Sequence, residues 1–132
     1  MTHRLLASRR RTLQQLAALA GALGLSTPMT ALACRDEREA LDEAIAALLP
    51  SRASAAAVGD AYLRQAPREA SAARLEALVL GSMREAGLPV TPAGLRRRIE
   101  RDFAEERIVR LDGWLLSATE VRLCALACSQ PP

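Results

Sequence analysis

The chain has 132 residues, half of them hydrophobic and only three aromatic, and its formal net charge at pH 7 is +3. Four arginines near the N-terminus account for this positive charge, because residues 34–132 hold 14 arginines, no lysine and 15 acidic residues, a net charge of −1. This balance argues against a basic protein of the kind that binds nucleic acid. The only histidine is His3, so residues 34–132 lack the imidazole of Ser/His and Cys/His pairs, histidine zinc sites and histidine haem ligation.

Residues 4–34 have the organisation of an export signal. Arg4 and the arginines at 9–11 precede residues 13–25, an uncharged and largely apolar stretch that is shorter than the ~20 residues a membrane-spanning helix needs. Ala31 and Ala33 form the small-x-small pattern that signal peptidase accepts, so we expect cleavage after Ala33. Residues 1–33 are therefore predicted to be a signal peptide and residues 34–132 a single helical domain.

The basic part of this segment resembles the twin-arginine (Tat) export motif, through Ser8, Arg9, Arg10 and Leu13. Thr12 and Gln14 depart from the usual motif, which leaves an ordinary Sec signal as the alternative. The resemblance implies the Tat translocase as a partner and the periplasm as the destination.

Cys34 would be the first residue after cleavage, which raises the alternative of a lipoprotein attached to the membrane through this cysteine. A lipobox prefers leucine three positions before the cysteine, where this chain has Ala31, and Pro28 separates Cys34 from the apolar stretch. Simple cleavage is therefore favoured over lipidation, and contact with the membrane is expected to be transient.

Apolar residues at helical spacing predict an all-α fold, a small bundle of about five helices. The first helix is expected over residues 36–49, before Pro50. The second is expected from Ser51 or Ser54 to the residue before Pro67, which is predicted to lie in the first turn of a third helix. Gly87 is expected at the C′ position of that third helix, with Leu88 folding back onto it.

The C-terminal half predicts two further helices with a short hairpin or extended corner between them, near residues 108–116. Thr91 and Pro92 are expected as N-cap and first residue of a helix that runs to about residue 106. Asp112 and Gly113 form the strongest turn signal in the chain. Ser117 and Glu120, three residues apart, predict a capping box for a last helix that runs to about residue 128.

The charged helix around residues 95–106 is predicted to have a solvated face. An apolar stripe is expected at Leu95, Ile99 and Phe103, which places the arginines at 96–98 in solvent rather than at an anionic partner. Asp102, Glu105 and Glu106 share a face, and the arginines near them favour a salt-bridged surface over a cation site.

Three cysteines, Cys34, Cys124 and Cys128, would enter an oxidising compartment after export. Three thiolates are too few for an all-cysteine zinc centre, so we expect no metal site and no cofactor. One disulfide is possible at most, and Cys34 paired with Cys128 or Cys124 would close a loop of roughly 90 residues. The alternative for Cys124 is a small buried apolar residue.

Trp114, the only tryptophan, follows the predicted turn. A buried core position is favoured for it, and the alternative is a contact with a partner protein.

The sequence DGWLLSATEVRLCALA at residues 112–127, preceded by RDFAEERIVRL, resembles the closing segment of small proteobacterial proteins that begin with a Tat signal. The resemblance covers about a third of residues 34–132 and implies no activity. It suggests that Trp114, Ser117, Glu120 and Cys124 form a recurring structural corner.

These features predict an exported helical protein without a catalytic centre of its own. Tat carries folded cargo, which matters most when a cofactor is inserted before export, and this chain lacks cofactor ligands. We therefore expect an accessory subunit or assembly factor of a larger exported oxidoreductase. The alternatives are a free-standing periplasmic protein and a lipoprotein anchored at Cys34. A thiol enzyme using Cys124 or Cys128 ranks last because it has no histidine base.

Overall fold

The computed structural model describes residues 29–129. The chain divides into two compact units, residues 1–31 and 32–132, and the second contains almost all of the described residues. The Tat-motif residues Ser8, Arg9, Arg10 and Leu13 lie outside the described part of the chain, as does most of the predicted signal peptide.

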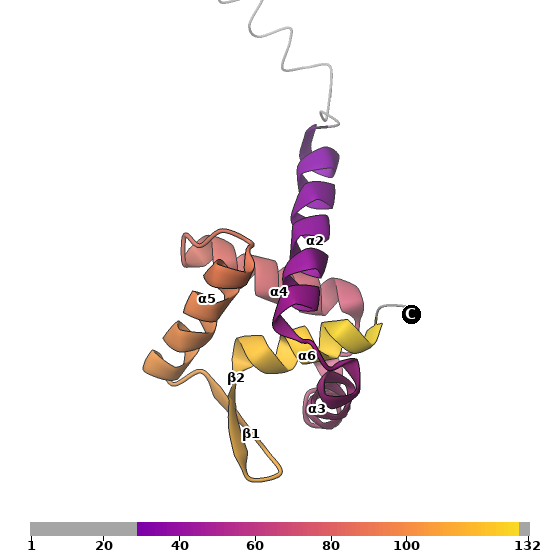
Figure 1. The fold of residues 1–132 in the computed structure, drawn as a ribbon, viewed down its shortest axis with the longest axis vertical. Helices are drawn as coiled ribbons and strands as arrows, with labels where there is room; N and C mark the ends of the chain where they lie inside the picture. The colour runs from indigo at the N-terminus through magenta and orange to yellow at the C-terminus, as the bar shows by residue number, and fades with distance from the viewer. Residues whose placement is uncertain (1–28, 130–132) are drawn as a thin grey trace, which may run out of the picture. The chain divides into compact units, whose positions relative to one another are not determined.

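The predicted all-α class is confirmed: the described residues form five α-helices and one short antiparallel hairpin (Figure 1). In chain order they are α2 (Met29–Leu48), α3 (Arg52–Gln65), the 3-10 turn η1 (Pro67–Glu69), α4 (Ala72–Glu85), α5 (Pro92–Ala104), β1 (Ile108–Leu111), β2 (Trp114–Ser117) and α6 (Ala118–Ser129). No helix within residues 29–129 has both the length and the hydropathy that crossing a bilayer requires.

Helix α6 is the centre of the fold, and α3, α4 and α5 all pack against it (Figure 1). Seven of its twelve residues are buried, because an alanine- and leucine-rich helix with little charge can face protein on most sides. Helix α2 adds Leu41, Ala44 and Ile45 to the same core. Salt bridges from Arg38 to Glu76 and from Glu37 to Arg84 join α2 to α4.

Local signals explain where the helices begin and end. Ser51, Ser71 and Thr91 are N-caps, and each side-chain oxygen accepts a hydrogen bond from the backbone N–H three residues later. Gly87 has a φ of +62° and the Leu88 N–H donates to the Met83 carbonyl at 3.0 Å, which is the predicted Schellman end of α4.

The hairpin is also confirmed. Asp112 and Gly113 both have positive φ, 46° and 89°, as a two-residue type I′ loop requires. The register pairs Leu111 with Trp114 and Ile108 with Ser117. Ser117 and Glu120 form the predicted capping box, with both hydrogen bonds at 2.9 Å.

Several predicted details are wrong. The third helix begins at Ala72 instead of Pro67, because Ser71 caps it and Pro67 starts a separate 3-10 turn. The first helix starts seven residues earlier than expected, at Met29. The last helix ends at Ser129, close to the predicted end, and Cys128 near that end is exposed.

The stripe predicted for α5 is correct at Leu95, which is buried, and at Ile99, which packs against the core, but it is wrong at Phe103. Phe103 is 45% exposed, whereas Arg98 is only 3% exposed and Asp102 2%. These two side chains occupy the buried face because they pair with each other and because Asp102 also accepts the backbone N–H of Thr119 at the start of α6. Asp102 is therefore salt-bridged as predicted, but in the interior instead of on the surface.

Candidate functional site

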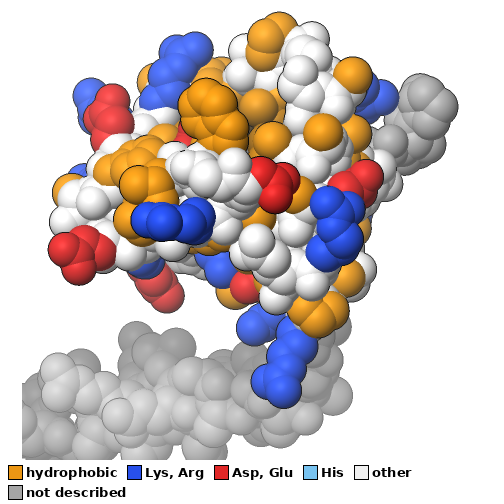
Figure 2. Space-filling view, turned by 90° about the horizontal axis from the view of Figure 1, so that it is seen from below, with side chains coloured by type: hydrophobic (Ala, Val, Ile, Leu, Met, Phe, Trp, Pro, Cys, Tyr) orange, Lys and Arg blue, Asp and Glu red, His pale blue; other side chains and the backbone are white. Residues whose placement is uncertain are grey.

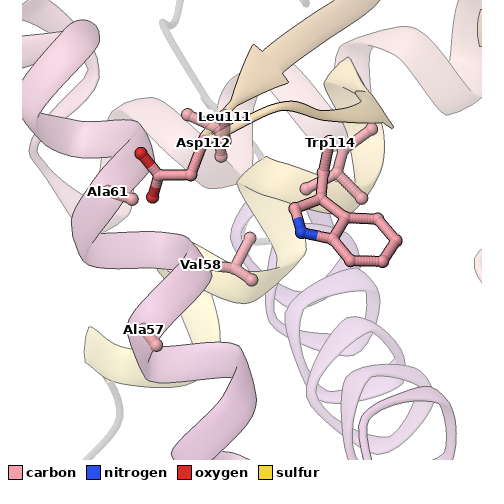
Figure 3. A pocket seen from close by; sticks show the side chains of 7 residues that line it. Ala57, Val58, Ala61, Leu111, Asp112 and Trp114 are labelled. Atoms are coloured by element: carbon pink, nitrogen blue, oxygen red, sulfur yellow. The ribbon is translucent and has the colours of Figure 1, made fainter.

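The strongest candidate site is an apolar groove between α3 and the hairpin, with a volume of about 310 Å³. Figure 3 shows Val58 of α3 between Asp112 on one side and Trp114 on the other. The lining is apolar except for one carboxylate, and its residues are Ala57, Val58, Ala61, Leu111, Asp112, Trp114 and Leu116. We call this the α3–hairpin groove.

The wall on α3 follows from how that helix packs. Its buried face consists of Ala55, Gly59 and Tyr62, which turn towards α6. Ala57 and Ala61 lie one turn apart on the neighbouring face, which the hairpin approaches without covering. Near the end of α3, the Gln65 side-chain amide donates to the Arg110 carbonyl at 3.3 Å and ties the helix to β1.

The opposite wall comes from one face of the hairpin. Leu111 and Trp114 are cross-strand partners, so their side chains lie on the same face. Leu111 is buried, but Trp114 is 74% exposed. The prediction that Trp114 is a core residue is therefore wrong: the tight turn carries it to the end of the hairpin, where α3 does not enclose it.

An exposed tryptophan beside an apolar groove is an uncommon feature of a protein surface. Tryptophan buries a large apolar area when a partner covers it, and it is among the residues most enriched at the energetic centres of protein interfaces. Figure 2 views the molecule from below, and on the face that it shows hydrophobic side chains gather with single acidic and basic side chains among them. The groove is thus suited to contact with another protein.

A second pocket of about 310 Å³ lies where α2, α5 and α6 meet, lined by Leu48, Leu49, Arg96, Ile99, Glu100, Glu120 and Leu123. It carries both signs of charge, and Glu120 is already committed to the capping box. Its lining contains no exposed aromatic residue. The α3–hairpin groove is therefore the better candidate.

Two ionic clusters, the first centred on the buried Asp102 and the second partly buried, hold the scaffold around the groove. In the first, Arg98 and Arg107 both contact the Asp102 carboxylate, at 2.6 and 3.1 Å. Arg107 also pairs with Glu105, which in turn contacts Arg98. This cluster joins α5 to the start of α6, directly after the hairpin.

The second cluster joins α3, η1 and α6 through Glu69. The Tyr62 hydroxyl donates to Glu69 at 2.6 Å, and Arg122 donates two hydrogen bonds at 3.0 Å. The Arg122 hydrogen bonds hold the pKa of Glu69 below its usual range. Burial and the hydrogen bond to Glu69 raise the pKa of Tyr62 to about 12. Tyr62 therefore stays protonated, and the cluster is a structural clasp in the folded chain.

The three cysteines are free thiols in the structure. Cys34 is exposed on α2, Cys124 is buried, and Cys128 is exposed with its thiol 3.1 Å from the Cys124 carbonyl. Burial raises the pKa of the Cys124 thiol to about 11. The residue Cys128 is exposed, but its sulfur is partly buried against α6 and α3, and this partial burial together with Asp60 raises the pKa of its thiol. Raised values keep both groups in the unreactive thiol form at neutral pH.

The structure brings only some of the singled-out residues together. Ser117 and Glu120 meet in the capping box at the start of α6. Cys124 is buried further along α6, and Trp114 lines the groove at the far end of the hairpin, so neither joins the capping box. No three histidine, cysteine or acidic side chains within residues 29–129 gather in a way that could hold a metal ion.

Sequence reasoning missed the α3 wall of the groove. Ala57, Val58 and Ala61 belong to an alanine-rich stretch without a distinctive pattern, so nothing local marked them. The Arg98–Asp102 pair did carry a signal, the i,i+4 spacing of opposite charges, but that spacing does not tell a buried pair from an exposed one.

No protein-family model matches the chain, and comparisons with curated proteins and with solved structures find no similar protein.

Proposed function

We propose that the chain is a non-catalytic docking protein, an accessory subunit or assembly factor of a larger exported redox enzyme, that binds its partner through the α3–hairpin groove. One observation carries the proposal: Trp114 is 74% exposed over an apolar groove of about 310 Å³. Truncating a tryptophan to alanine at the best interface positions costs on the order of several kcal/mol of binding free energy.

Export to the periplasm is part of the proposal, and the packing of α2 is compatible with it. Leu32, Ala33 and Cys34 are exposed, and from residue 32 onwards the first core residue of α2 is Leu41. The ion pairs to α4 start from Glu37 and Arg38. Cleavage after Ala33 would therefore remove none of the buried residues and ion pairs described above for residues 34–129.

The chemistry of the thiols favours docking over catalysis by the chain itself. Cys124 is buried and Cys128 lies close to a backbone carbonyl, and the pKa of each thiol is raised. A cysteine nucleophile works as a thiolate, usually beside a cation or a base. The surroundings of both cysteines oppose that form.

The test is capture from the native periplasm with the tagged full chain, followed by mass spectrometry. Three forms are compared: wild type, Trp114→Ala in the groove, and Phe103→Ala as the control. Phe103 is also a large exposed hydrophobic side chain, 45% exposed, but it lies on α5 outside the groove lining.

We expect wild type and Phe103→Ala to retain the same oxidoreductase and Trp114→Ala to lose most of it. Equal capture by Trp114→Ala would overturn the groove as the docking surface. A monodisperse monomer that retains no oxidoreductase in any of the three forms would overturn the accessory role itself.

A further inference from the structure

We propose that the segment accepted by the α3–hairpin groove carries an arginine next to its apolar side chains, and that Asp112 selects it. This inference rests on the docking function proposed above and specifies the chemistry of the partner. It follows from the one charged residue in the groove lining.

The Asp112 carboxylate is not engaged by another side chain within the described part of the chain. Its side chain makes no hydrogen bond or ion pair with any other residue from 29 to 129. Many other acidic side chains of this domain are paired with arginine, including Glu69, Glu76 and Asp102. Asp112 is therefore an available carboxylate at the edge of an apolar surface.

The hairpin also holds the Asp112 backbone in place. The residue lies between Leu111 and Trp114, which are paired across the strands, and its φ of 46° belongs to the type I′ turn. The carboxylate is thus presented at the groove by a short closed loop, with little backbone freedom to move away when the groove is covered.

Covering the groove changes the surroundings of this carboxylate. A partner that buries Trp114 and Val58 also removes water from Asp112, and an unpaired carboxylate is costly to desolvate. A cation on the partner offsets that cost, a neutral residue leaves it in place, and an acidic residue adds repulsion. The groove therefore discriminates by charge as well as by hydrophobicity.

Arginine fits these surroundings better than lysine. Its planar guanidinium binds a carboxylate through two parallel hydrogen bonds, and it also stacks on an indole face. Asp112 and Trp114 flank the same groove (Figure 3) and offer both interactions. The second pocket, with Arg96, Glu100 and Glu120 in its lining, has no such single-sign preference.

The test uses three soluble synthetic peptides that share one leucine–alanine face and differ at a single flanking residue, arginine, glutamine or glutamate. Trp114 is the only tryptophan, so a blue shift of its emission reports binding in the groove directly. We expect the arginine peptide to bind about tenfold more tightly than the glutamate peptide, with the glutamine peptide between them, and the difference to shrink as salt is added.

The matched variants are Asp112→Asn and Asp60→Asn. Asn–Gly is a preferred type I′ pair, so Asp112→Asn keeps the turn and removes only the charge. Asp60→Asn removes the same charge from an exposed position of α3 outside the groove lining. Asp112→Asn should bind all three peptides alike, and Asp60→Asn should retain the wild-type order.

Each outcome has a distinct meaning. If wild type binds the three peptides equally, or if Asp112→Asn keeps the wild-type order, the charge selection by Asp112 is wrong while docking in the groove stands. If no peptide shifts the Trp114 emission, the groove does not accept apolar segments, and the docking function fails together with this inference.

Discussion

Gly59 of α3 lies directly against the backbone of α6 at Ala125: a Cβ atom built on Gly59 would stand only 2.8 Å from the Ala125 Cα. Real Cβ atoms do not approach a backbone atom so closely. The missing side chain is what allows α3 and the central helix to pack at short range. Because α3 forms one wall of the groove, this contact also sets where that wall stands.

Gly59→Ala should therefore destabilise the domain by about 1–3 kcal/mol, since the two helix backbones must separate to admit the methyl group. Urea unfolding followed by circular dichroism measures the change. Gly81→Ala is the control: it lies inside α4 with nothing within 4 Å of its built Cβ. There the same substitution should stabilise by about 0.5–1 kcal/mol, because alanine has the higher helix propensity. Equal stability of Gly59→Ala and wild type would refute the close contact.

The Tyr62–Glu69 clasp predicts a loss of stability at alkaline pH. The pKa of Tyr62 is raised from 10.0 to about 12 in the folded chain. The folded state thus holds the Tyr62 proton more tightly than the unfolded chain does. The resulting contribution to the free energy of unfolding is fully present below pH 10 and is lost as the pH rises through 12. Tyr62→Phe should cost about 1 kcal/mol at pH 7 and the cost should shrink above pH 10.

The measurement is urea unfolding at a series of pH values, together with an absorbance titration of Tyr62, the only tyrosine. The acidic side of the same clasp supplies the control. Because folding lowers the pKa of Glu69, this residue stabilises the folded state at pH values above its ordinary pKa of 4.5. The contribution to stability is lost as the pH falls through the pKa that Glu69 has in the folded state. Glu69→Gln should therefore lose less stability than wild type on acidification. A Tyr62 that titrates at pH 10 would contradict the clasp.

Asp102→Asn should be among the most damaging single substitutions in the domain. It leaves Arg98, which is 3% exposed, without its closest carboxylate, and losing one partner of a buried ion pair costs about 3–5 kcal/mol. Glu105→Gln is the control, because Glu105 contacts the same arginine from a position that is 48% exposed and should cost less than about 1 kcal/mol. Unfolding midpoints in urea compare the two variants, and similar midpoints would show that Asp102 is dispensable.

A chain that begins at Cys34 should unfold at the same urea concentration as the full-length chain. Residues 34–36 are exposed, and among residues 32–48 of α2 the first core residue is Leu41. A chain that begins at Ala46 should be clearly less stable because it lacks Leu41, Ala44 and Ile45, and deletion of even one large core side chain costs about 2–5 kcal/mol.

The intact mass of the protein purified from the periplasm checks the proposed processing. The expected mass is that of residues 34–132 with an unmodified Cys34. A diacylglyceryl group on Cys34 would replace simple cleavage by the lipoprotein alternative. Retention of residues 1–33 would contradict export with cleavage.

Signals that act within a few residues of the chain were legible in the sequence. Thr91 and Pro92, Gly87 and Leu88, Asp112 and Gly113, and the Ser117–Glu120 box all occur in the structure in their predicted roles. Each depends on hydrogen bonds or dihedral angles that the neighbouring residues satisfy among themselves, so no distant part of the chain is needed to specify them.

Burial was decided by the tertiary structure instead. Periodicity predicted Phe103 in the core and Arg98 in solvent, and the structure shows the reverse. The backbone N–H of Thr119, at the start of α6, donates to Asp102, 17 positions away in the chain. This contact between distant segments turns the charged face of α5 towards the interior. Composition predicted a buried Trp114, but α3 does not extend over the tip of the hairpin, so the Trp114 side chain stays exposed. The sequence by itself determined the helical class, the turn at Asp112 and the caps at Thr91 and Ser117, because their interactions are local, whereas it placed the starts of α2 and α4 wrongly. The tertiary structure decided which helix and hairpin faces pack together. The α3–hairpin groove therefore depends on contacts between distant segments, which no local sequence pattern encodes.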